Sequence, residues 1–175
     1  MRTYTIIPAQ TFSFEYRCHC CGKKTNFITS NKFRVNANHN LLDVWLIYKC
    51  EICDYTKNLT IYERISPKKI NSLEYEGFMN NDLDLAFQYG VKKDMFNRNG
   101  LTVQTDVKYT ITSENLEDDE KNFEIINPYG LKIKTIKVIA DILEISKNKA
   151  VKMNKNGEIL FDYDYLQLKN NIQIM

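Results

Sequence analysis

The sequence predicts an α+β fold: an N-terminal zinc-ribbon-like antiparallel β region, central helices, and a C-terminal helix–helix–β module. Three observations predict it. Strand-like segments dominate the first 65 residues, two C-x-x-C pairs flank two of those segments, and helical patterns follow further along the chain. The corresponding domains are 1–65, a helical or mixed connecting region at 66–129, and 130–175. The length of 175 residues and the hydrophobic content of 43% are ordinary for one or two globular domains.

The strand signals of the first region come from aromatic and β-branched residues. FRVNA (33–37) and DVWLIYK (43–49) are of this kind, and the turn-forming NHNLL lies between them. YTKNLTIYERI (55–65) is typical of a further strand, and TYTIIPA and FSFEYR add one or two more. We therefore expect an antiparallel β region before residue 66.

Helix signals begin directly after this region. Ser66 followed by Pro67 is a helix-start pattern and predicts a helix over about residues 67–78. The segment NNDLDLAFQYGVKKDMFNRNG predicts a second helix capped by Asn81, followed by a short turn that runs to Gly100. The middle of the chain is therefore expected to be mainly helical.

Charge is distributed unevenly along a chain whose formal net charge is only +2. Residues 101–129 carry seven acidic and two basic residues, whereas residues 130–157 carry seven lysines and two acidic residues. This contrast predicts a localised partner surface in the lysine-rich segment. Within the acidic part, 106–111 alternates as a strand does, and 113–124 is typical of a solvated loop or short helix.

Four of the five cysteines form two C-x-x-C pairs: Cys18, Cys21, Cys50 and Cys53. Two such pairs can present four thiolates to one tetrahedral ion. Gly22, directly after the first pair, supplies the permissive φ that a tight turn needs. Asp54 stands at the equivalent place in the second pair and also tolerates turns. The spacing therefore predicts two similar metal-binding turns.

The 28 residues between the two pairs contain two expected strands, which would fold back and return the chain to the first pair. This order is typical of a zinc ribbon. A closed four-thiolate site has no open position for water or substrate, so we expect one structural zinc ion, in preference to iron. The alternatives are redox-active or disulfide-paired cysteines, another metal, or no metal.

The fifth cysteine, Cys20, lies inside the first pair. Using it as a ligand would break the C-x-x-C spacing, so we expect a free thiol. Arg17, Lys23 and Lys24 make its neighbourhood electropositive, which makes Cys20 a candidate reactive thiol. His19 is expected to face solvent rather than to bind the metal.

No motif of a known catalytic mechanism stands out in the chain. It has no phosphate-cradling glycine loop, no nucleophile elbow and only two histidines, so we expect no enzyme; the remaining enzymatic alternative uses Cys20 as a nucleophile. The N-terminus lacks a signal-peptide pattern, and no run approaches the roughly 20 apolar residues of a spanning helix. We expect a cytoplasmic protein with no membrane partner, in a compartment where paired cysteines favour metal over disulfides.

The lysine-rich segment predicts two short helices followed by strands. An apolar stripe at helical spacing marks the first helix: Ile136, Ile139, Ala140 and Leu143. Ser146 is placed to cap the second helix, and Asn156-Gly157 to end it. Six lysines on these helices are the candidate RNA-binding residues: Lys134, Lys137, Lys147, Lys149, Lys152 and Lys155.

Residues 131–175 resemble the small RNA-binding module named after a small-subunit ribosomal protein, the S-four module. The matching positions are, in order, Lys134, Ile139-Ala140, Ser146-Lys147, Ala150, Met153-Asn154, Gly157 and Ile159. The resemblance implies binding of structured RNA, either ribosomal or transfer RNA. The chain departs from the module in Thr135-Ile136, in Asn154, and in lysines where arginines are usual. Lysine makes a point-charge contact with phosphate without arginine's bidentate fork.

The segment FRVNANHNLLDVWLIYKCEIC (33–53) resembles a phrase of an uncharacterised bacterial family with a two-knuckle zinc-ribbon-like region at its N-terminus. This resemblance implies no particular activity. We therefore interpret the chain as a zinc-stabilised protein that binds structured RNA through its C-terminal module. The alternatives are a zinc-ribbon protein-interaction adaptor without a nucleic-acid role, whose lysines form a solvated helix face, and a thiol or zinc redox sensor.

Overall fold

The computed structural model describes residues 2–114 and 122–175, and within these ranges the fold is mixed α+β with two sheets and five α-helices. The chain forms two compact units. We call Gln10–Gln104 the cysteine unit, and Met1–Ala9 together with Thr105–Met175 the lysine unit. The limits of these units differ from the boundaries at 65 and 129 that the sequence predicts.

A four-stranded antiparallel sheet, in the order β2-β3-β4-β5, is the framework of the cysteine unit. Its strands are β2 (Phe14–Arg17), β3 (Lys24–Asn38), β4 (Leu41–Cys50) and β5 (Thr56–Ile65). Every second side chain of β4 is buried, as expected for a strand with one face on a core. An irregularity between Thr29 and Lys32 breaks the register of β3, where Asn31 has a φ of +56°.

The cysteine unit also contains a short 3₁₀ turn, η1 (Pro67–Lys69), and three helices, α1 (Ser72–Asn80), α2 (Leu83–Gly90) and α3 (Lys93–Arg98). The helix predicted over 67–78 starts later than expected. The Ser66-Pro67 pattern produces only the 3₁₀ turn, and the true cap of α1 is Asn71, whose side chain accepts from the Leu73 N–H.

The prediction that Asn81 caps the second helix is wrong by one residue. Asp82 is the cap of α2, because its carboxylate accepts a hydrogen bond of 2.7 Å from the Leu85 N–H. Asn81 instead ends α1 with a left-handed φ of +53°, a conformation that asparagine tolerates well. Its side chain accepts from the Phe33 N–H at 2.7 Å, which ties the helix end to β3.

Aromatic side chains fill the core of the cysteine unit. The following are fully buried: Phe12, Phe14, Phe27, Tyr48, Met95 and Phe96. Phe14 stacks on Phe27 with ring centres 5.6 Å apart, and Tyr48 meets Phe96 edge to face at 5.7 Å. The Tyr48 hydroxyl donates to the Phe12 carbonyl at 3.2 Å, and burial raises the pKa of Tyr48 above its usual range. This core supports the strand ends that carry the cysteines.

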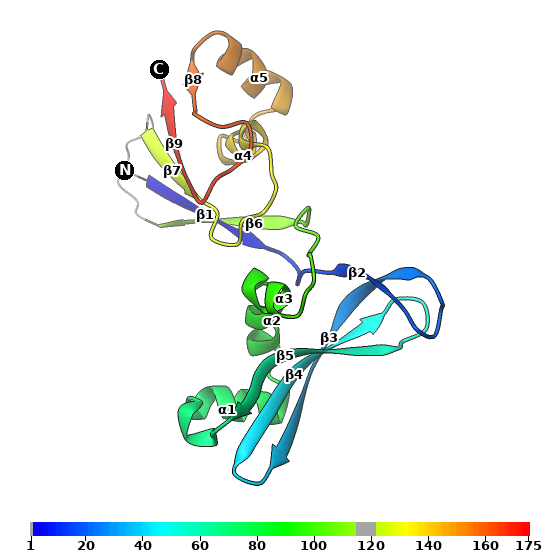
Figure 1. The fold of residues 1–175 in the computed structure, drawn as a ribbon. Helices are drawn as coiled ribbons and strands as arrows, with labels where there is room; N and C mark the ends of the chain where they lie inside the picture. Colours follow the sequence, from blue (N-terminus) through cyan, green and yellow to red (C-terminus); the bar gives the residue numbers. More distant parts are fainter. Residues whose placement is uncertain (1, 115–121) are drawn as a thin grey trace. The chain divides into compact units, whose positions relative to one another are not determined.

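A five-stranded sheet, in the order β6-β1-β7-β9-β8, forms the lysine unit. Its strands are β1 (Arg2–Pro8), β6 (Tyr109–Glu114), β7 (Asn122–Ile126), β8 (Ile159–Leu160) and β9 (Lys169–Ile174). The first strand of the chain, dark blue in Figure 1, lies antiparallel to β6 and parallel to β7. The prediction that this strand belongs to the N-terminal β region is therefore wrong, because its pairing partners come from more than 100 residues later.

Two helices of the lysine unit, α4 (Thr135–Ile142) and α5 (Lys147–Lys155), precede β8 and β9, which agrees with the predicted order of elements. Ser146 caps α5 as expected, accepting from the Lys149 N–H at 3.2 Å. Buried apolar residues of the helices and of the sheet form the core: Ile6, Phe123, Ile125, Val138, Ile139, Ala150 and Ile172.

The expected strand at 106–111 starts later than predicted, at Tyr109. Of the acidic stretch 113–124, the structure describes the end of β6 and the beginning of β7, and residues 115–121 lie outside the described residues. Within residues 2–114 and 122–175, no helix combines the length and apolar character that crossing a bilayer requires.

Candidate metal centre

Two tight turns carry the cysteine pairs, and they are built alike. The Gly22 N–H donates to the Cys18 carbonyl at 2.9 Å, and the Asp54 N–H donates to the Cys50 carbonyl at 3.0 Å. A second backbone bond of 2.9 Å, from the N–H of each first cysteine, closes the base of each turn. Gly22 and Asp54 both adopt left-handed backbone, with φ of +68° and +58°. The predicted turn role of both residues is confirmed.

The sheet register brings the two turns together. The first turn connects β2 to β3, the second connects β4 to β5, and β3 pairs with β4 so that Phe27 lies opposite Cys50. The Glu51 N–H of the second turn donates to the Asn26 carbonyl at 3.1 Å, and the Asn26 side-chain amide donates to the Glu51 carboxylate at 3.0 Å. The second turn is therefore fixed to the strand that follows the first.

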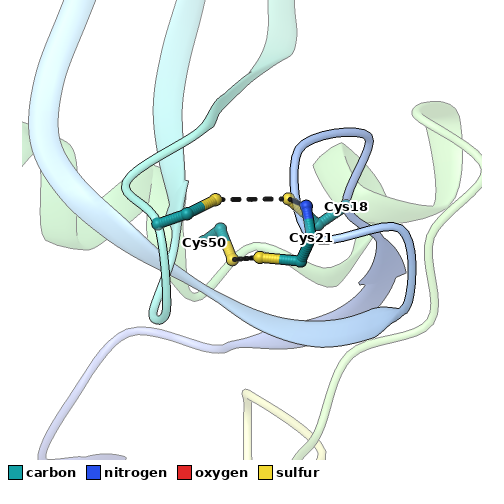
Figure 2. Close-up of side chains that lie close together, drawn as sticks. Cys18, Cys21 and Cys50 are labelled. Carbon is teal, nitrogen blue, oxygen red and sulfur yellow. Dashed lines mark hydrogen bonds between the residues drawn. The ribbon is translucent and has the colours of Figure 1, made fainter.

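The four paired cysteines point their sulfurs toward one another, as Figure 2 shows for Cys18, Cys21 and Cys50. The Sγ atoms of Cys18 and Cys53 are 3.5 Å apart, those of Cys21 and Cys50 are 3.9 Å apart, and all four lie within 4.8 Å of one another. A disulfide would need about 2.05 Å. A tetrahedral ion with metal–sulfur bonds of about 2.3 Å places its ligand sulfurs about 3.8 Å apart. The cluster therefore has the geometry of a four-thiolate metal site.

Backbone and hydroxyl groups support the first cysteine of each pair. Cys18 and Cys50 are buried, and each accepts an N–H···S hydrogen bond within its own turn, from Cys21 at 3.4 Å and from Ile52 at 3.5 Å. The buried Thr25 hydroxyl lies 3.2 Å from the Cys50 sulfur. Such donors favour the ionised thiolate that a metal ion requires and orient its sulfur.

The thiols of the cluster do not ionise independently. Burial raises the pKa of the Cys50 thiol, but hydrogen bonds from Thr25 and from backbone N–H groups of its turn outweigh burial and lower this pKa to about 6. The pKa of Cys21 is raised instead, first by its hydrogen bond with the Cys53 thiol and then by burial. Four negative thiolates at these distances repel one another, so full ionisation needs a cation among them.

The residues between the two ligands of the first pair stay outside the cluster. Cys20 is exposed, and so is His19, whose ring centre lies 5.9 Å from that of Tyr55.

The supporting role of Thr25 is not among the predictions from the sequence. The signal for it is the alternation along β3, in which Thr25 and Phe27 share the buried face.

The six predicted lysines are all exposed in the lysine unit. Lys134, Lys137 and Lys147 line a common pocket of about 230 Å³, together with Lys132, which was not singled out from the sequence. Lys132 and Lys134 are two residues apart in the extended segment before α4. Side chains at this spacing point to the same side of an extended chain, and this spacing is the sequence signal for Lys132. Lys149 borders a different pocket, most of whose lining residues are apolar.

The fold and the site define a mixed α+β protein with a four-cysteine cluster that can hold a metal ion. The chain belongs to the family described as protein of unknown function (DUF1062), whose profile matches residues 35–164. The match includes the second cysteine pair and both helices of the lysine segment. No curated protein and no solved structure matches the chain. The expected membership of an uncharacterised family is confirmed.

Proposed function

We propose that this protein is a zinc-stabilised RNA-binding protein that holds structured RNA, ribosomal or transfer RNA, through its lysine-rich C-terminal segment. The observation that carries the proposal is the set of six exposed lysines on and beside α4 and α5. Among the described residues, none of the six lysines has a carboxylate within ion-pair distance. Uncompensated positive charge of this kind attracts the phosphate backbone of nucleic acid.

The order of elements in the lysine unit supports the same proposal. Two short helices followed by strands, with Ser146 as cap and Gly157 at a φ of +77° after the second helix, occur at the positions where the sequence resembles the S-four module. In this proposal the lysines contact phosphates as point charges, and the shape of the RNA decides which RNA is held. The protein acts in the cytoplasm and catalyses no reaction.

We assign zinc to the cysteine cluster because four thiolates in a closed tetrahedral arrangement are the typical donor set of structural zinc. The sulfur separations of 3.5 and 3.9 Å agree with that ion. Elemental analysis of freshly reduced protein should find about one zinc per chain. Iron, or no metal, would overturn the assignment. Zinc that is retained under mild peroxide would exclude a thiol or zinc redox sensor.

The RNA function is tested by binding to ribosomal and transfer RNA at increasing salt. If six lysines each neutralise one phosphate, affinity should fall by roughly a thousandfold between 50 and 200 mM salt. Lys147→Glu with Lys152→Glu should reduce affinity at least tenfold. The matched control, Lys68→Glu with Lys69→Glu, makes the same charge change in the cysteine unit. Affinity that is independent of salt, or equal effects of the two double variants, would contradict the proposal.

A second candidate function, a protein-interaction adaptor, is favoured by three apolar side chains on α1 and α2. Leu73, Leu83 and Met79 are 77%, 67% and 55% exposed. Large apolar side chains exposed on two consecutive helices are candidates for a protein contact site. The RNA experiment separates the two functions, because an adaptor of this kind predicts no salt-dependent binding to any of the RNAs.

A further inference from the structure

Four lysines converge on one pocket of the lysine unit, which we call the lysine pocket: Lys132, Lys134, Lys137 and Lys147. They come from the extended segment before α4, from α4 itself and from the first residue of α5. From this convergence we propose that the lysine pocket binds a dianionic phosphate group, the terminal phosphate of a phosphate monoester. The proposal rests in part on the proposed RNA function, since three of these lysines are among the six candidates.

Among the described residues, none of the four lysines of the pocket forms an ion pair with a carboxylate. Asp106 is the acidic residue of its lining, and it forms no ion pair with any of the four lysines. Like charges that share a small space repel one another, and an anion placed between them removes that repulsion. A dianion gains about twice the Coulomb energy of a monoanion at the same position. The pocket therefore favours a terminal phosphate over an internal phosphodiester.

Two tyrosines contact two of the four lysine side chains. The Lys137 ammonium lies 5.1 Å from the ring centre of Tyr109, and the Lys132 ammonium lies 5.9 Å from that of Tyr165. The Tyr109 hydroxyl donates to the Asp141 carboxylate, which anchors its ring to α4. A backbone bridge pairs Lys134 with Tyr165. Two of the four lysines thus lie beside uncharged aromatic rings that border the pocket.

The size of the pocket suits a phosphate with the atoms next to it. Its volume of about 230 Å³ equals that of roughly seven or eight water molecules at about 30 Å³ each, whereas a phosphate has five heavy atoms. The four lysines are exposed, so the pocket opens to solvent and the rest of the ligand can extend outward. The ligand class is a phosphate monoester, either at the 5′ end of an RNA or on a small molecule.

The first test is calorimetric titration of the full-length protein, at low salt, with inorganic phosphate, adenosine 5′-monophosphate and dimethyl phosphate. We expect saturable binding of the first two with Kd below about 1 mM, and at least tenfold weaker binding of the monoanionic diester. Lys134→Met and Lys147→Met should each weaken monophosphate binding at least tenfold. The control Lys155→Met, on α5 but outside the pocket, should change it less than twofold.

The outcomes separate a site from general attraction to positive charge. Equal affinity for the diester, or an equal effect of Lys155→Met, would overturn the proposal, as would the absence of saturable binding. Because all of these lysines are exposed, the variants should keep the wild-type thermal unfolding transition. The comparison of monoester with diester uses wild-type protein only. It therefore tests the preference of the lysine pocket for a dianion even if a variant fails to fold.

The second test identifies the source of the phosphate and keeps the two proposals apart. One RNA is prepared with a 5′-phosphate and with a 5′-hydroxyl. Tighter binding of the phosphorylated form, lost in Lys134→Met, assigns the pocket to an RNA end. Equal binding of both RNAs with retained monophosphate binding assigns it to a small phosphorylated molecule. RNA binding without monophosphate binding would overturn the pocket but not the RNA function, and the reverse result would overturn only the RNA function.

Discussion

The cysteine cluster and the lysine pocket both gather four side chains of like charge, but they do so in opposite ways. In the cluster, short side chains on backbone turns hold the sulfurs 3.5 and 3.9 Å apart, and two of the four cysteines are buried. In the pocket, long and exposed side chains surround about 230 Å³. The first geometry fits a small bare cation, and the second fits a larger anion that keeps part of its hydration.

The difference teaches what each ion does for the protein. An ion at the cysteine cluster binds to a site that exists only in the folded chain, so its binding free energy adds to the stability of the fold. An anion in the lysine pocket meets screened, solvent-exposed charges and can exchange freely. We therefore expect the cysteine cluster to be structural and the lysine pocket to be the place of a reversible ligand.

The largest expected effect comes from removing one buried ligand of the cluster. Cys50→Ser should lose the metal, and with it the cooperative unfolding transition of the cysteine unit, because structural zinc supplies on the order of 10 kcal/mol to the folding of small domains. Metal content by elemental analysis and thermal unfolding by circular dichroism measure both effects. The matched control is Cys20→Ser, which should leave both unchanged. A loss of metal in the control would mean that Cys20 is a ligand.

A smaller effect is expected from the hydroxyl that supports Cys50. Thr25→Val keeps the shape of the side chain but removes the donor 3.2 Å from the sulfur. Loss of such a supporting group typically lowers metal affinity about 10- to 100-fold. Competition with a chelating dye measures the change, and Thr60→Val in β5 of the same sheet is the control. If both variants bind metal as the wild type does, the hydroxyl has no part in tuning the site.

The two turns of the cluster have different residues at their left-handed position, Gly22 in the first and Asp54 in the second. Substitutions at these two positions test how the backbone holds the sulfurs. Gly22→Ala adds a Cβ that meets no atom within 4 Å, so its cost is the backbone strain of about 1–2 kcal/mol. Asp54→Gly should relieve strain at the equivalent position. Chemical denaturation of the metal-bound protein should therefore show lower stability for the first variant and unchanged or higher stability for the second.

The smallest effect compares the two sites under salt. Raising the ionic strength from about 0.01 to 0.15 M shortens the Debye length from about 30 to 8 Å, which should weaken monophosphate binding severalfold. The metal content of the cysteine cluster should stay constant over the same range, because its charges lie in direct contact with the ion. Monophosphate affinity that does not depend on salt would show that the lysines contribute little to the pocket.

The parts predicted from the sequence are those with a short-range pattern. The two C-x-x-C pairs and Gly22 specify the two cysteine turns within a few residues, and the cap at Ser146 specifies the start of α5. The Asn81 prediction failed because two adjacent polar residues compete for one cap, and tertiary contact with Phe33 decides between them. Local patterns of this kind carry little information on which strands pair or which distant segments come into contact.

Long-range pairing explains the remaining differences. Nothing within Arg2–Pro8 indicates that its partners are β6 and β7, and nothing local to Lys132 indicates that α5 brings Lys147 to the same pocket. The contact of Thr25 with Cys50 likewise depends on the pairing of β3 with β4. Each of these contacts forms only when the chain segments that it joins have come together within their own unit.

The position of β1 in the lysine unit has a consequence for the order in which the protein is made. The strand β1 is synthesised before Gln10–Gln104, but both of its neighbours in the sheet are translated after the whole of that unit. The cysteine unit can therefore complete its fold and assemble its four-cysteine cluster during translation, as domains commonly do. The strand waits unpaired until then, and its sequence-distant pairing makes the lysine unit the slower of the two to form.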